Sequence, residues 1–155
     1  MIGLFGAPNN LIYQARKGFN GSYTSGVVLM SYPEFQALAI GAKDSDSPST
    51  CLIQGEKGWL KVETAPNQLE KIACQIRGED NIQEYALNQY PHRLSHEFAA
   101  FAAMLANKDF AGRDLYLNIS LQVAEAAEKS RKQADISFLA DQYLRSVPGG
   151  AKCPE

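Results

Sequence analysis

Three apolar segments follow one another along the chain: Gly26-Val-Val-Leu-Met-Ser-Tyr32, Phe35-Gln-Ala-Leu-Ala-Ile40 and Cys51-Leu-Ile-Gln-Gly-Glu-Lys-Gly-Trp-Leu-Lys-Val62. Each segment is short, rich in apolar and β-branched residues, and bounded by turn-forming Gly, Pro or Ser, which is the pattern of β-strands. Strands that tight turns connect pair in the antiparallel sense. We therefore predict an antiparallel sheet at the centre of the fold.

Further strands extend this sheet. Residues 11–19 end in Asn20-Gly21, a dipeptide that tolerates the positive φ of a tight turn. Residues 55–58 read Gly-Glu-Lys-Gly, which places glycine at both ends of a hairpin connection. Residues 71–77 and 83–87 are weaker strand candidates. The prediction is an open, largely antiparallel sheet of about six strands, or seven if both weaker candidates form.

Helical periodicity dominates the second half of the chain. Apolar residues recur from residue 94 at intervals of four, three and four, which places them on one face of a helix. A second helix is predicted from about residue 114 to residue 134. The first apolar stripe comprises Leu94, Phe98, Phe101 and Leu105, and the second helix is expected to bury Leu117, Leu121 and Ala124.

The N-terminus also has a helical signal. Residues 2–8 are predicted to finish a helix, because Gly6 supplies a left-handed stop and Pro8 cannot continue it. The chain therefore begins within an element that has no N-terminal cap. We expect the sequence to be a piece of a larger protein.

Together these elements predict an α+β fold in which two or three helices cover one face of the sheet. Both faces of the central strand are apolar, since Val27 and Leu29 alternate with Val28 and Met30. The face without helices therefore also needs a cover. A second copy of the chain is the simplest cover, so we expect a homodimer through the open sheet face.

The composition fits one domain of ordinary size, because 45% of the 155 residues are hydrophobic. We predict a domain at residues 1–147 and a flexible tail at residues 148–155. Lys and Arg number 15 against 17 acidic residues, without a long basic run, so nucleic acid is not an expected partner. Apolar runs are too short for a membrane span, and the N-terminus lacks a signal peptide's basic start. A cytoplasmic protein is expected.

Motifs for catalysis and cofactor binding are absent or incomplete. The loop at 55–58 lacks the GxxxxGK[ST] and GxGxxG spacings that bind phosphate. His92 and His96 stand four residues apart, but Glu97 lies outside the pair and no third metal ligand is apparent. The three cysteines lack CxxC spacing, and no GxSxG motif activates a serine. We expect no catalytic residue, cofactor site or metal site in this chain.

A few residues remain as candidates for contact with a ligand. Lys43 ends an otherwise apolar strand, where a cation at the rim of the sheet can meet a hydroxyl or a carboxylate. A solvated lysine at a strand end explains the same position. Tyr13, Tyr23 and Tyr90 can line a pocket, although aromatic packing requires no ligand.

The order of several motifs resembles a known family. The motifs are Leu4-Phe-Gly-Ala-Pro8, Asn20-Gly-Ser-Tyr-Thr-Ser-Gly26, Tyr32-Pro-Glu-Phe35, Lys43-Asp-Ser-Asp-Ser-Pro48, Ile53-Gln-Gly-Glu-Lys-Gly58 and the helix with Glu97-Phe98. Over residues 1–135 this order is similar to the C-terminal domain of the glucose-fructose oxidoreductase, inositol dehydrogenase and rhizopine-catabolism family (Gfo/Idh/MocA), nearest to its dihydrodiol-dehydrogenase-like members.

This resemblance implies a larger enzyme. In that family an N-terminal Rossmann domain binds NAD or NADP, and hydride passes between the nicotinamide and a hydroxyl-bearing carbon of a sugar, cyclitol or diol. The family's catalytic motifs precede the position matched by Met1, so no catalytic residue is carried over. The family's layout places the segment around Tyr23 to Ser25 and the strand end at Lys43 toward the substrate cleft or the subunit interface. Lys43 and Tyr23 are therefore the predicted substrate contacts.

Three functions follow from these expectations. The first is a substrate-binding and oligomerisation domain of an NAD(P)-dependent oxidoreductase, inactive without its Rossmann domain. The alternative is a free-standing homodimeric binding or assembly module without catalysis. A small sugar-binding domain with a pocket between sheet and helices is the third.

Overall fold

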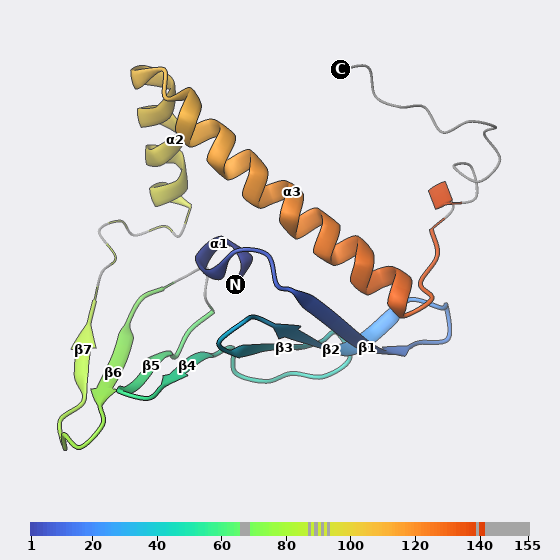
Figure 1. Ribbon diagram of the computed structural model, residues 1–155, viewed down its shortest axis with the longest axis horizontal. Helices are drawn as coiled ribbons and strands as arrows, with labels where there is room; N and C mark the ends of the chain where they lie inside the picture. Colours follow the sequence, from blue (N-terminus) through green and yellow to red (C-terminus); the bar gives the residue numbers. More distant parts are fainter. Residues whose placement is uncertain are drawn as a thin grey trace. The chain divides into compact units, whose positions relative to one another are not determined.

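The structure is a computed structural model that describes residues 1–65, 69–86, 88, 90, 92, 94–138 and 140–141. Within these residues it contains seven strands and three helices, and every strand pair is antiparallel (Figure 1). The predicted α+β class is confirmed. The predicted tail at residues 148–155 lies outside the described residues.

The chain folds into two compact units. The first comprises Met1–Ser45 and Asp114–Glu155, and the second comprises Asp46–Arg113. The strands form two sheets rather than one continuous sheet, with three strands in the first unit and four in the second. The polar, turn-rich residues 43–50 separate the two sheets along the chain, because they supply bends and coil instead of a paired strand.

The first sheet has the order β1 (Asn10–Lys17), β2 (Tyr23–Ser31) and β3 (Gln36–Ala42). The predicted turn at Asn20-Gly21 joins β1 to β2, and Gly21 has the expected positive φ of 76°. The N–H group of Gly18 donates to the carbonyl of Ser22 across this turn, at 2.8 Å.

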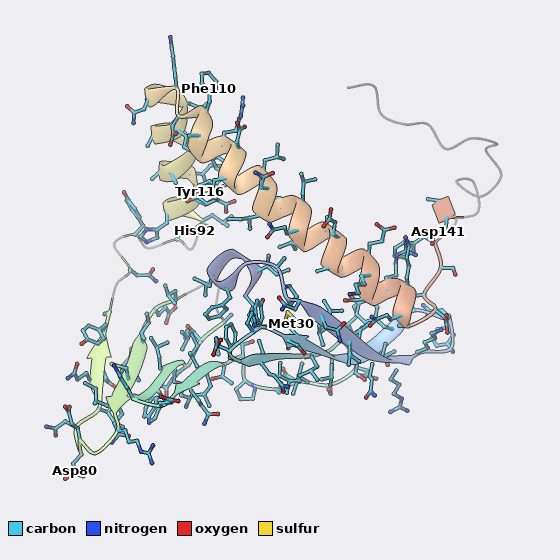
Figure 2. All side chains as sticks on the ribbon, in the orientation of Figure 1. Met30, Asp80, His92, Phe110, Tyr116 and Asp141 are labelled. Carbon is cyan, nitrogen blue, oxygen red and sulfur yellow. The ribbon has the colours of Figure 1, made fainter. Side chains whose placement is uncertain are left out.

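The pairing register gives the first sheet an inner face that forms a core. Leu11 lies opposite Met30, which lies opposite Ala37, so the three side chains share one face. Leu11 and Met30 are buried, with 4% and 5% of their surface exposed, and Ala126 packs against them from α3 (Phe110–Gln133). Figure 2 shows Met30 on the side of β2 that faces α3.

The face of α3 that meets the sheet differs from the predicted stripe. Leu117 and Leu121 are more than half exposed, and Ala124 is exposed as well. Ser130 is buried instead, and Ala126 is half-buried against the core. The sheet already supplies large side chains at this contact, so the helix approaches it through small residues.

The N-terminal helix ends as the sequence predicts. α1 (Ile2–Phe5) stops at Gly6, whose φ is 77° and whose N–H group donates to the carbonyl of Ile2 at 2.8 Å. The hydroxyl of Tyr32 then donates to the carbonyl of Gly6 at 3.1 Å. The ring of Tyr32 stacks on Phe35 with centroids 4.4 Å apart, so the β2–β3 turn is fixed to α1.

The second unit contains β4 (Cys51–Gly55), β5 (Gly58–Val62), β6 (Ile72–Ile76), β7 (Gln83–Tyr85) and α2 (Ser95–Asn107), and its strands pair in sequence order. Gly55 lies opposite Gly58, which confirms the predicted hairpin. The apolar stripe of α2 is exposed, with Phe98 at 68% and Leu105 at 80%.

The C-terminus of α3 has a Schellman motif. The N–H of Asp135 donates to the carbonyl of Lys132, and the N–H of Ile136 donates to that of Arg131, at 3.2 and 3.1 Å. Asp135 has a left-handed φ of 51°, and Ile136 is buried beyond it. The helix therefore ends at a defined residue.

Further contacts fasten the segment after α3 to the helix. Arg131 donates to the carbonyl of Ile136 at 2.9 Å and forms two hydrogen bonds with the carboxylate of Asp141. These hydrogen bonds hold the pKa of the Asp141 carboxyl below its usual range. The ring of Phe138 packs under the Arg131 guanidinium, 4.6 Å from its centroid.

Replacing Asp135 by glycine should stabilise the protein. Glycine adopts a left-handed conformation without the steric conflict of a Cβ atom, so Asp135→Gly is expected to raise the free energy of unfolding by about 0.5–1 kcal/mol. Asp135→Ala is the matched control and should lower it. Urea unfolding of the three proteins measures the difference, and a loss of stability in Asp135→Gly would contradict the Schellman geometry.

Candidate functional site

The two predicted contact residues, Lys43 and Tyr23, lie together at one end of the first sheet. Tyr23 begins β2, and Lys43 directly follows β3. The Lys43 ammonium nitrogen lies 3.8 Å from the centroid of the Tyr23 ring, which is a cation–π contact. The backbone brings them together, because the N–H of Lys43 donates to the carbonyl of Thr24 at 2.6 Å.

Tyr13 of β1 joins this pair. Its ring passes over Gly26, where an added Cβ would come within 2.6 Å of the phenol oxygen. Burial raises the pKa of the Tyr13 phenol, the nearby Tyr23 raises it further, and the Lys43 ammonium acts in the opposite direction. The three side chains thus act on one another electrostatically, and Tyr13, Tyr23 and Lys43 are called the Lys43 cluster below.

The sequence pattern indicates Tyr13 as a possible pocket residue but does not place it next to Lys43 and Tyr23. The signal that identifies it is Gly26, because a glycine inside a strand marks a place where another group approaches the backbone closely. Tyr90 does not belong to the cluster. It lies in the second unit, and its ring packs edge-on against His96 with centroids 4.7 Å apart.

The chemistry of the Lys43 cluster is that of hydrogen-bond donors. Among the described residues no carboxylate forms an ion pair with Lys43, so its ammonium group retains donors for another partner. Phenol and ammonium groups donate to the oxygens of hydroxyl and carboxylate groups. The cluster suits binding and orientation of such groups.

The histidines and cysteines considered as metal ligands or reactive groups are not part of the Lys43 cluster. His92 accepts a hydrogen bond from the N–H of Leu94 at 3.2 Å, and within the described part of the chain no group of three His, Cys, Asp or Glu side chains is arranged to hold a metal ion. Cys51 and Cys74 are half-buried free thiols in the second sheet. Cys153 lies outside the described residues.

A shallow hollow of about 480 Å³ lies at the β4–β5 hairpin. It is lined mainly by apolar side chains and glycines of β4, β5 and β6, among them Ile53, Leu60 and Ile76. Trp59, which also lines the hollow, donates to the side-chain oxygen of Gln75 at 3.1 Å. The Lys43 cluster belongs to the first unit, and the residues that line this hollow belong to the second.

The face of the first sheet opposite α3 is a second functional candidate. Its residues are Ile12, Val27, Leu29, Leu38 and Ile40, which are called the outer face below. Ile12, Leu38 and Ile40 are 47%, 55% and 74% exposed. Such a contiguous apolar surface on a sheet is typical of an interaction site.

None of the helices in the described residues has the length and apolar character needed to cross a membrane.

Comparison with known proteins identifies oxidoreductases as relatives. Over 139 residues the chain is 27% identical to scyllo-inositol 2-dehydrogenase (NADP(+)) IolU of Bacillus subtilis, an alignment that covers 90% of this chain and 42% of that protein. Over 142 residues it is 29% identical to the uncharacterized oxidoreductase YgjR of Escherichia coli, with the same two coverages. No protein-family model matches the chain.

The chain therefore spans less than half the length of the curated relatives that it matches. Its homology to oxidoreductases agrees with the resemblance that its motifs show to a C-terminal domain of the Gfo/Idh/MocA type.

The titration of Tyr13 tests the geometry of the cluster. Lys43→Ala should raise the pKa of Tyr13 further, because it removes the cation that favours the phenolate, and Tyr23→Phe should lower it. NMR titration of the tyrosine ring carbons from neutral to alkaline pH measures both changes. A Tyr13 pKa that responds to neither substitution would show that the three side chains are not neighbours.

The same raised pKa has a consequence for stability. The folded protein keeps the Tyr13 proton at a pH where the unfolded chain has begun to lose it. The stability from this group is therefore complete below the unfolded pKa and is lost as the pH rises through the folded pKa.

Proposed function

We propose that this chain is the substrate-binding and oligomerisation part of an NAD(P)-dependent oxidoreductase of the Gfo/Idh/MocA type, which acts on a hydroxyl group of a sugar, cyclitol or diol. The observation that carries the proposal is the similarity to two oxidoreductases over 90% of this chain and 42% of theirs. One of these relatives is by name a dehydrogenase of scyllo-inositol that uses NADP.

In this proposal the cofactor and the substrate are bound by different parts of the enzyme, because this chain lacks the motifs that bind a dinucleotide. The 155 residues contain neither a GxGxxG nor a GxxxxGK[ST] motif, which are the glycine-rich loops that hold phosphates at a helix N-terminus. We assign the cofactor, and with it the hydride transfer, to a Rossmann domain outside this chain. The chain's own contribution is to position the substrate, and we expect no turnover from it alone.

The Lys43 cluster is the proposed substrate contact. A polyol presents several hydroxyl oxygens, and the cluster presents one ammonium group and two phenol groups. Lys43 rests on the Tyr23 ring, which limits the positions its ammonium group samples. Tyr13 is held across Gly26 by the packing of the sheet. These residues are proposed to orient a substrate hydroxyl toward the cofactor.

The outer face of the first sheet is the proposed homodimer contact. Covering Ile12, Leu38 and Ile40 removes apolar surface from water, which favours association at roughly 25 cal/mol per Å². A second copy presents the same apolar face, so an isologous contact is self-complementary. A free-standing homodimeric module would use the same contact. The two functions differ in their requirement for a cofactor domain.

Lys43→Ala tests the substrate contact. The suitable protein is a chimera in which this chain replaces the matched part of the Bacillus subtilis dehydrogenase, with scyllo-inositol and NADP as reactants. Loss of a charged hydrogen-bond donor should lower kcat/KM about tenfold or more. Lys61→Ala is the control, because Lys61 pairs with Glu63 in the second sheet. Equal kcat and KM in Lys43→Ala and the parent chimera would remove Lys43 from the site.

Ile40→Glu tests the dimer contact. Ile40 lies on β3, and a charge at this position of the outer face would be desolvated in a dimer, so the variant is expected to be monomeric where the parent is dimeric. Ile40 is exposed, so the fold of the single chain should be retained. Leu52→Glu is the control at an equally apolar, exposed position of β4. Sedimentation that is identical for Ile40→Glu and the parent would exclude the outer face.

A further inference from the structure

The side chain of Gln133, the last residue of α3, binds the backbone of β1 at two points. Its carbonyl oxygen accepts a hydrogen bond from the N–H of Tyr13 at 2.8 Å. Its amide nitrogen donates to the carbonyl of Leu11, also at 2.8 Å. One side chain therefore satisfies a backbone donor and a backbone acceptor that lie two residues apart on the same strand.

These two backbone groups lie on the open edge of the sheet. In the described strand order β1 is an edge strand, with β2 as its partner. Because Leu11 and Tyr13 direct these groups to Gln133, the groups point away from β2. An edge strand with unpaired N–H and C=O groups is a template for another extended chain. A strand added at this edge would bond to these groups through one backbone C=O and one backbone N–H. The Gln133 amide presents the same combination, one acceptor and one donor.

Contacts made by neighbouring residues also hold Gln133 next to β1. The Schellman motif ends the helix immediately after it, and Arg131 is tied to the carbonyl of Ile136. A second tie lies further along the same strand, where the Lys17 ammonium donates to the carbonyl of Asp135 at 3.0 Å. The last residue of α3 thus contacts β1 at Leu11 and Tyr13, and Asp135, just after the helix, contacts it at Lys17.

We propose that Gln133 acts as a substitute strand that closes the edge of β1 against strand addition by a second copy of this chain. The blocked association is edge to edge, through the backbone. It is distinct from the proposed dimer, which uses side chains of the outer face. The proposal does not depend on the oxidoreductase function.

Gln133→Ala tests this role, with Asn118→Ala as the matched control on an exposed position of the same helix. Both substitutions are made in the Ile40→Glu protein, so that association through the outer face does not contribute. Gln133→Ala is expected to speed hydrogen exchange at the Tyr13 amide about tenfold, the size expected for loss of one hydrogen bond. It should also produce concentration-dependent association with thioflavin T fluorescence, whereas Asn118→Ala should do neither.

Gln133→Glu keeps the acceptor for the Tyr13 N–H and loses the donor for the Leu11 carbonyl, so it should associate to an intermediate degree. This variant maintains the test if Gln133→Ala fails to fold. Faster Tyr13 exchange without association would show that Gln133 only anchors the helix, and would overturn the proposal. Unchanged exchange and unchanged sedimentation in both variants would also overturn it.

Discussion

The packing of α3 on the inner face of the first sheet is the contact on which the first unit depends. It joins a segment near the start of the chain to one near its end, because Leu11 and Met30 share their core with Ala126. Small residues of α3 lie at this contact, and the Gln133 amide at the end of the helix reaches the main chain of β1. Without this helix the core of the sheet would be exposed to water.

This packing also determines which surfaces remain for function. The helix occupies the inner face, so the outer face and the ends of the sheet are left for partners and ligands. At one end the hairpin turn between β1 and β2 and the exit of β3 bring the Lys43 cluster together. The exposed apolar residues of the outer face and of α2 are consistent with a chain that is covered by further protein, as proposed for part of a larger oxidoreductase.

The sequence predicted the elements better than their packing. Strands and turns depend on local signals, and Asn20-Gly21 and Gly55-Glu-Lys-Gly58 mark their hairpins correctly. The prediction of which α3 residues are buried was wrong. Leu117 and Leu121 are the more apolar residues, but Ala126 and Ser130 are the ones buried or half-buried in the structure.

For the candidate site, too, the sequence predicted individual residues but not which of them come together in the fold. Lys43 was named from its position at a strand end, Tyr23 was named as a possible pocket residue, and the family resemblance placed both toward the cleft or the subunit interface. The structure brings the two side chains into contact. Their neighbour Tyr13 was not assigned, since its approach depends on the space above Gly26 in the next strand. The role of Gln133 could not be predicted either, because its partners lie about 120 residues away in the chain.

The central proposal is that this chain holds the substrate side of a hydride-transfer enzyme and that the nicotinamide cofactor binds to a domain outside it. Calorimetric titration of the purified 155-residue chain with NADPH and NADH, followed by an assay with scyllo-inositol and NADP, tests it most directly. The account predicts no saturable cofactor binding and no turnover. Tight binding of either cofactor together with oxidation of the cyclitol would contradict it.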